Sequence, residues 1–158
     1  IIINLPNVKN LTKELAKLGQ QHQNSQYARN FQSPDSHLAL NAERLASSLS
    51  RGDPTLHAIY LAAFEQSSMD AMMNYYRANF PREPYAEAAF MQVDRIQAPV
   101  LQFHGLNDTA LLPASLNNTW DELDQDWTLV TIPGAGHWPH HDKPDMVTNM
   151  MKAWLELH

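Results

Sequence analysis

The amino-acid sequence predicts an α/β protein in which parallel strands with flanking helices are interrupted by an all-helical segment. Two observations indicate this fold class. Two short apolar runs, at 99–104 and 127–132, each end in a glycine-containing loop, with room for one helix between them. Between the apolar run at 1–5 and these two runs, the apolar residues recur at helical rather than alternating spacing.

The segment 8–95 is predicted to contain helices and no strand. Leucines at helical spacing predict a first helix that Gly19 ends, since glycine readily closes a helix. A second helix is expected to start from a cap at Asp35 or Ser36 and to end near Gly52. Two further helices are expected, one capped by Asp53 before Pro54 and one starting at Ser67 or Ser68 and stopping before Pro81.

The segment 96–158 is predicted to form strands and helices in alternation. Leu116, Trp120 and Leu123 predict the inner face of a helix between the two strands. A last helix is expected after Pro144, with an apolar face at helical spacing that would pack on the sheet. Its members are Val147, Met150, Met151, Trp154 and Leu155. Gln102 is unusual in a buried strand and needs a hydrogen-bond partner.

Asp108 and His137 are the strongest candidates for catalysis. Each follows one of the two predicted strands, and the loops at the carboxyl ends of neighbouring parallel strands lie side by side. The carboxylate could then fix the imidazole tautomer and leave the second ring nitrogen to take a proton from water or a hydroxyl. Acid and base would be two members of a catalytic triad, with the nucleophile expected upstream.

The loops that carry these two residues resemble a known family. The strings "HGLNDTALLP" and "PGAGHWPHHDKPDMV" resemble the acid loop and the histidine loop of the α/β-hydrolase fold, in its epoxide hydrolase-like branch. The resemblance implies that Asp108 is the charge-relay acid and His137 the general base. It also implies a division into a core strand at 1–7, a helical cap, or lid, at 8–95 and the C-terminal part of the hydrolase core at 96–158.

The resemblance extends to the predicted cap. The string "MMNYYRANF" is similar to the epoxide hydrolase segment that carries one of two ring-opening tyrosines, and the match makes Tyr76 that residue. In "YARNFQSPD", Asn30 stands where the second tyrosine is expected, and Tyr27 lies one helical turn earlier. Tyr76 and Tyr27 are therefore candidate substrate-binding residues, as is Trp138 beside the candidate base.

The resemblance implies hydrolysis through a covalent ester, which water activated by His137 then cleaves. An aspartate nucleophile would act on an epoxide or, as a haloacetate or haloalkane dehalogenase does, on an organohalide; a serine would act on an ester. All four tryptophans follow the predicted cap and all five tyrosines lie within it, which favours an epoxide over a halide. A ligand-binding protein without catalysis is the alternative of another class.

Composition limits the partners. The chain has 158 residues, 44% of them hydrophobic and 18% charged, and a net charge of −6, which argues against binding nucleic acid or anionic membranes. It has no cysteine, and no apolar run approaches the roughly 20 residues that span a bilayer. A cytoplasmic enzyme that needs no cofactor and acts on a small-molecule substrate is expected. His140 and His141 make a metal site conceivable, but Pro139 breaks the helical spacing that such a site needs.

The sequence also predicts that a further part of the enzyme exists. It starts inside a predicted strand without methionine, and none of its five glycines belongs to a nucleophile elbow such as G-x-S-x-G. We therefore expect the C-terminal portion of a longer enzyme, with the missing N-terminal half as its partner and a homo-oligomer as the other option.

Overall fold

The computed structural model describes residues 1–85 and 94–158, and residues 86–93 of the predicted cap lie outside the described part. The chain divides into two compact units. The first, here called the sheet unit, comprises Ile1–Ser25 and Glu83–His158, and the second, the helical unit, comprises Gln26–Arg82. The helical unit is shorter than the predicted cap at 8–95, whose assignment as a lid stays a prediction.

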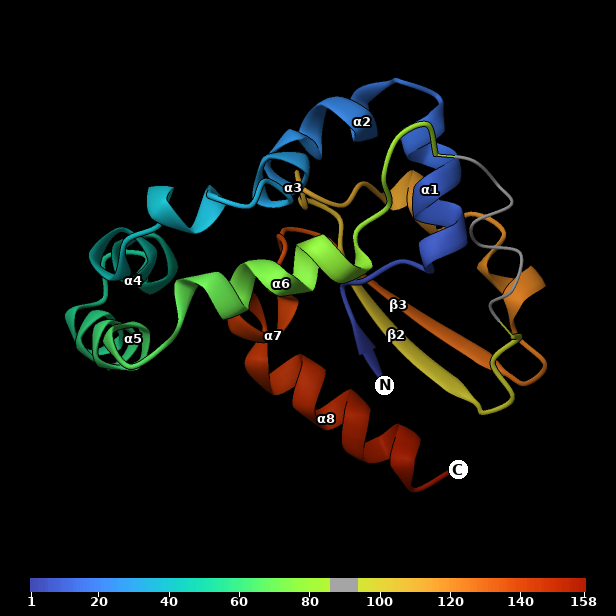
Figure 1. Ribbon diagram of the computed structural model, residues 1–158. Coiled ribbons are helices and arrows are strands. Elements are labelled where there is room, and N and C mark those ends of the chain that lie inside the picture. Colours follow the sequence, from blue (N-terminus) through green and yellow to red (C-terminus); the bar gives the residue numbers. More distant parts are fainter. Residues whose placement is uncertain (86–93) are drawn as a thin grey trace. The chain divides into compact units, whose positions relative to one another are not determined.

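The sheet unit is built on three parallel strands in the order β1, β2 and β3 (Figure 1). The strands are β1 (Ile2–Ile3), β2 (Val100–Gly105) and β3 (Trp127–Ile132). In register, Ile2 lies opposite Gln102 and Val100 lies opposite Trp127. All six residues of the central strand are buried, as expected for a strand paired on both sides. The predicted fold class, parallel strands with flanking helices, is confirmed.

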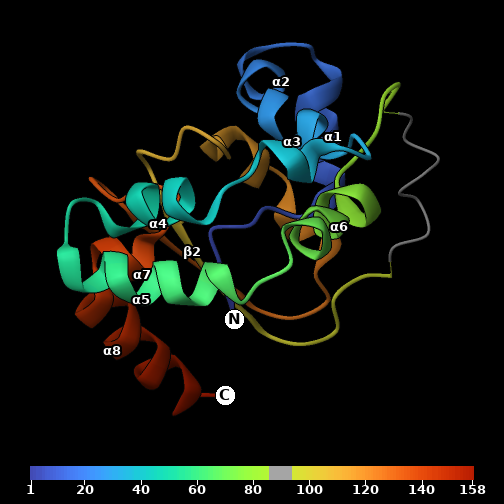
Figure 2. The same ribbon diagram turned by 60° about the vertical axis from the view of Figure 1, so that its left-hand side comes forward.

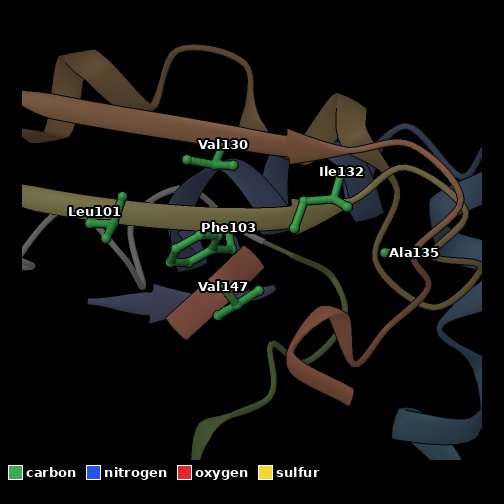
Figure 3. Packing of buried hydrophobic residues seen from close by; sticks show 6 residues of the cluster. All are labelled: Leu101, Phe103, Val130, Ile132, Ala135 and Val147. Carbon is green, nitrogen blue, oxygen red and sulfur yellow. The ribbon is translucent and has the colours of Figure 1, made fainter. Parts of the chain in front are cut away.

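The core of the sheet unit lies between the sheet and the last helix, α8 (Pro144–Leu155) (Figure 3). Val147 of α8 is 2% exposed, and Met150, Met151 and Trp154 pack partly buried against the same cluster, so the predicted apolar face is confirmed except at the 59%-exposed Leu155. Burying each large side chain contributes about 1.5–3 kcal/mol. The buried cluster comprises Leu101, Phe103, Val130, Ile132, Ala135 and Val147.

Gln102 has the partners that its position in a buried strand requires. Its side-chain amide donates to the carbonyl of Leu5 at 2.9 Å and accepts from the indole Nε1 of Trp127 at 3.0 Å. Both bonds remove the cost of burying an unpaired amide, because each polar atom exchanges water for a protein partner. The predicted need for a partner is confirmed.

The connection between β2 and β3 differs from the prediction of one helix. It contains two short 3₁₀ helices, η3 (Pro113–Leu116) and η4 (Thr119–Glu122), and Asn118 between them takes a left-handed conformation with φ 63°. That conformation interrupts a helix and turns the second segment in a new direction. Leu116 and Leu123 are buried as predicted, but Trp120 is 56% exposed.

Two helices follow β1 within the sheet unit, α1 (Val8–Ala16) and α2 (Gln20–Asn24). Asn7 caps α1 by accepting from the backbone of Lys9 at 2.9 Å. The predicted stop at Gly19 is wrong by one residue. Leu18 takes the left-handed position with φ 53°, and Gly19 is instead the N-cap residue of α2.

The helical unit contains four α-helices and one 3₁₀ helix (Figure 2). The cap predicted at Asp53 is confirmed, and of the two predicted starts Ser67 and Ser68 the structure has Ser68, since the Asp53 and Ser68 side chains accept from backbone N–H groups in the first turn. The cap predicted at Asp35 or Ser36 is wrong. The chain is extended at Leu40, and the side chain of Asn41 caps α4 instead. The elements are α3 (Gln26–Phe31), η1 (Ser36–Ala39), α4 (Ala42–Ser50), α5 (Pro54–Glu65) and α6 (Met69–Asn79).

Within residues 1–85 and 94–158, every helix is too short or too polar to cross a bilayer.

Gly105 ends β2 where only a hydrogen atom fits. A Cβ there would lie 2.1 Å from the carbonyl oxygen of Gly136 and 2.6 Å from that of Ala135, both backbone atoms that cannot turn aside. We expect Gly105→Ala to lower the free energy of unfolding by about 1–3 kcal/mol, measured by chemical denaturation. Gly19→Ala is the matched control, because its Cβ would meet nothing within 4 Å. Equal midpoints for the two variants would contradict the expectation.

Candidate active site

Three polar side chains follow the three strands at one edge of the sheet. Asn4 comes directly after β1, Asp108 lies in the loop after β2 and His137 lies in the loop after β3. Because the strands are parallel, their carboxyl ends meet at this edge, where ligand chemistry is found in open α/β sheets. All three residues belong to the sheet unit.

Asp108 and His137 form a hydrogen-bonded acid–base pair. The Oδ2 atom of Asp108 lies 2.9 Å from Nδ1 of His137. The acid side chain is fully buried, and the imidazole is one-third exposed. Because a carboxylate only accepts, Nδ1 carries the proton and Nε2 is left as the acceptor. The structure thus brings together the two residues that the sequence paired.

The carboxyl group of Asp108 is stabilised as an anion. Burial alone would raise its pKa, but hydrogen bonds from the His137 side chain and from the backbone N–H groups of Ala110 and Leu111 outweigh burial and lower the pKa. The bond from Ala110 N to Oδ1 measures 2.7 Å. The acid therefore stays ionised throughout the neutral range.

The loop that carries the acid is held from two sides. Gln21 of α2 donates to the carbonyl of Ala110 at 2.8 Å and accepts from Leu112 N at 2.7 Å. On the other side, Asn107 N donates to the carbonyl of Ala135 at 2.8 Å and so joins the acid loop to the histidine loop. The sequence did not single out Gln21, because its partners lie almost ninety residues away.

The histidine loop is fixed by a turn and a side-chain bond. Gly134 takes φ 78°, which favours glycine. Two residues on, Gly136 N donates to Oδ2 of Asp142 at 2.7 Å, and Asp142 ends the short helix α7 (Pro139–Asp142). Sequence reasoning expected a loop here. The structure has one helical turn, which Pro139 begins.

Asn4 completes the arrangement and was missed from the sequence. Its amide donates to Asp108 Oδ2, and its Oδ1 accepts from Gly105 N at 2.7 Å. The residue is 2% exposed and takes φ 59°. Asparagine is enriched in that left-handed region, so an asparagine that ends an apolar strand was the available signal.

The comparisons with known proteins concern the fold that carries these residues. No family model matches the chain. An epoxide hydrolase from Bacillus megaterium in complex with an inhibitor is 21% identical, with a TM-score of 0.81 over 98% of this chain and 59% of that chain. An epoxide hydrolase from metagenomes of hot environments is 27% identical, with a TM-score of 0.74 over 98% of this chain and 57% of that chain. The chain has the fold of the C-terminal part of an α/β-hydrolase.

This confirms the resemblance to the α/β-hydrolase fold and to its epoxide hydrolases. A non-heme bromoperoxidase from Mycobacterium tuberculosis is a more distant structural neighbour, 20% identical with a TM-score of 0.50 over 88% of this chain and 53% of that chain. By sequence, the chain is 31% identical over 130 residues to an Xaa-Pro dipeptidyl-peptidase from Lactiplantibacillus plantarum. The chain covers 16% of that peptidase and under three-fifths of each of these solved structures.

Trp138 and the two tyrosines are the remaining candidates on this α/β-hydrolase fold. Trp138 is 38% exposed, with its ring centroid 5.0 Å from that of His137. In the helical unit, the rings of Tyr27 and Tyr76 meet edge to face with centroids 6.1 Å apart. Burial, and then the neighbouring Tyr75, raise the pKa of Tyr76. Tyr27 and Tyr76 therefore lie together within one unit, as Asp108 and His137 do within the other.

Metal ligands do not gather among the described residues. The rings of His140 and His141 meet at 4.5 Å, but in 1–85 and 94–158 no three side chains of His, Cys, Asp or Glu are arranged to hold a metal ion.

His104 lies fully buried on β2, next to Gly105. Within residues 1–85 and 94–158 neither of its ring nitrogens makes a well-formed hydrogen bond, although the backbone of Leu111 interacts with the ring. Burial lowers its pKa from the ordinary 6.5, against the opposing charge of Asp108 and with a smaller contribution from His137. The imidazole is therefore neutral at pH 7. Sequence analysis gave it no role, since a histidine at a strand end carries no signal of its own.

His104 makes the fold sensitive to mild acid. The pKa of His104 is lower in the folded state than in the unfolded state. Below pH 6.5 the unfolded state therefore binds more protons, and the free energy of unfolding decreases as the pH is lowered. We expect His104→Phe to lose less stability than the wild type between pH 7.5 and 5, and to lie within about 1 kcal/mol of it at pH 7.5. The measurement is urea denaturation across that range, where Asp108 stays ionised. The exposed His158→Gln is the control, and identical slopes for His104→Phe and wild type would disprove the expectation.

Proposed function

We propose that this chain supplies the acid and the base of an epoxide hydrolase-type enzyme. One observation carries the proposal: a fully buried carboxylate bonded at 2.9 Å to an imidazole that is one-third exposed. Burial keeps the acid away from solvent and fixes the base, while exposure leaves Nε2 open to water or substrate. The structural likeness to epoxide hydrolases supports the choice of reaction.

The reaction proceeds in two steps. A carboxylate nucleophile, which we assign to a part of the enzyme outside this chain, attacks an epoxide carbon. The carbon–oxygen bond breaks, and the alkoxide takes a proton from a tyrosine phenol. His137 Nε2 then removes a proton from water, and the hydroxide cleaves the ester to release a diol and the free carboxylate. The imidazolium, stabilised by Asp108, gives up its proton to solvent, and the phenolate takes one from solvent.

Tyr76 and Tyr27 are proposed as the phenol donors. A donor must be protonated before ring opening, and burial raises the pKa of Tyr76, which keeps the phenol protonated at neutral pH. The edge-to-face contact between the two rings supports this pairing, although Tyr27 does not align with the second family tyrosine. Phe31 packs on Tyr76 with ring centroids 5.0 Å apart and restricts its orientation.

A hydrolase that uses a serine nucleophile is the second candidate. The observation in its favour is the 31% identity to a protein named as a dipeptidyl-peptidase. An Asp–His pair activates a serine as well as a water, so Asp108 and His137 fit both reactions. The substrate decides between them: turnover of an epoxide supports the first candidate, and turnover of a p-nitrophenyl ester or a peptide alone supports the second. Turnover of haloacetate would identify a dehalogenase.

Replacing the base separates the two chemical steps. In the protein that carries this chain, we expect His137→Gln to abolish steady-state epoxide turnover while one equivalent of substrate stays bound as an ester, since only ester cleavage needs the base. Intact-protein mass spectrometry detects the adduct. Asp108→Asn should lower kcat by roughly 10³- to 10⁴-fold.

His141→Gln is the matched control, a second histidine nearby in α7, and we expect it to keep activity within about twofold. Full turnover by His137→Gln would refute the proposal. Absence of turnover by the wild type on all substrates, with ligand bound unchanged, would favour a ligand-binding protein.

Removing the phenol tests the choice of substrate. We expect Tyr76→Phe to lower kcat/KM for an epoxide by roughly 10²-fold, because the developing alkoxide loses its proton donor, and to leave ester turnover within about threefold. Tyr75→Phe, the adjacent residue with a 55%-exposed side chain, is the control. Equal effects of the two substitutions on epoxide turnover would exclude Tyr76 as the donor.

A further inference from the structure

The side chain of Asn4 shares one oxygen atom with the candidate base. Its Nδ2 donates to Asp108 Oδ2, the same atom that accepts from His137 Nδ1. Nδ2 also lies 3.4 Å from that ring nitrogen. Two N–H groups from different strand ends thus converge on one carboxylate oxygen, whereas the other oxygen, Oδ1, accepts from Ala110 N.

The orientation of the Asn4 amide is fixed by the backbone. Gly105 N donates to Oδ1 at 2.7 Å, so the oxygen end of the amide faces β2 and the NH₂ end must face Asp108. The backbone of Asn4 is held as well, because Asn4 N donates to the carbonyl of Phe103 at 2.8 Å. With 2% of the residue exposed, water does not compete for these bonds.

From this convergence we propose that Asn4 is a positioning residue that aims the carboxylate at His137 and weakens its attraction for the imidazolium. The inference rests on the proposed acid and base roles of Asp108 and His137. An N–H bond to Oδ2 withdraws negative charge from the atom that would otherwise stabilise protonated His137. Asn4 thereby favours the neutral imidazole, which is the form that accepts a proton.

The surroundings supply two further titratable groups. His104 faces the pair from β2, and Asp142 lies on α7 with its Oδ2 on Gly136 N. A substitution at Asn4 keeps both residues, and the charge of His104 interacts with both members of the pair. The pH dependence is therefore compared between proteins that differ only at Asn4.

Asn4→Gly is the informative variant. Glycine accepts the φ of 59° without strain, so the substitution removes the amide and leaves the backbone conformation allowed. We expect the acid limb of the kcat/KM profile to move to higher pH by roughly 0.5 to 1 unit, with kcat lowered about tenfold. The matched control is Asn7→Gly, the same change three residues on at a helix cap, which should leave the limb in place.

The acid limb of the kcat/KM profile distinguishes a positioning role of Asn4 from a purely structural one. Loss of stability would lower the folded fraction most strongly in acid, so kcat/KM is divided by the folded fraction that circular dichroism measures at each pH. An unmoved acid limb in active Asn4→Gly after this division would overturn the proposal. If that variant fails to fold, the wild type still provides a test by NMR. The Asn4 side-chain amide resonances should follow the titration of His137, and those of Asn7 should not; Asn4 resonances that ignore the titration would also overturn the proposal.

The same titration separates this inference from the proposed function. A wild type without hydrolase activity whose Asn4 amide follows His137 would overturn the proposed reaction and keep the contact network. Hydrolase activity together with Asn4 amide resonances that do not follow the titration of His137 would keep the proposed reaction and overturn the proposed role of Asn4.

Discussion

Burial of an ionised carboxylate at the end of the central strand is the constraint on which the site depends. A buried charge is costly unless hydrogen bonds and an opposite charge compensate it. Asp108 obtains donors from Asn4 and His137, which belong to segments distant in the sequence, and from Ala110 in its own loop. The carboxylate can stay charged only while the three parallel strand ends stay in register, so the chemistry and the fold impose the same requirement.

The close approach of the loops makes this register strict. Ala135 accepts from Asn107 N, and the backbone at 135–136 lies where a Cβ of Gly105 would be. The glycine lets the histidine loop approach the end of β2 closely enough for the 2.9 Å bond between acid and base. Gln21 holds the acid loop from the other side through two backbone groups. The side-chain contact is thus the product of backbone packing, and rotation of the two side chains alone would not make it.

The sequence predicted the parts of this arrangement that depend on local pattern. The apolar runs, the caps at Asp53 and Ser68 and the apolar face that includes Val147 follow from short-range spacing, and the adjacency of Asp108 and His137 follows from the geometry of parallel strands. The parts that it missed depend on tertiary contact. Asn4 and Gln21 act across about a hundred residues, and the left-handed turns at Leu18 and Asn118 were hidden because neither position holds glycine.

The distribution of the candidate residues explains why the acid–base geometry says less about substrate than about mechanism. Asp108, His137 and Asn4 all lie in the sheet unit and suit any reaction in which an imidazole takes a proton from water or a hydroxyl. The residues that would discriminate an epoxide from an ester, Tyr27 and Tyr76, lie in the helical unit, where they contact one another and Phe31 packs on Tyr76. The two sets have no residue in common. A change of substrate class could therefore arise in the helical unit while the hydrogen bonds that keep Asp108 charged stay intact.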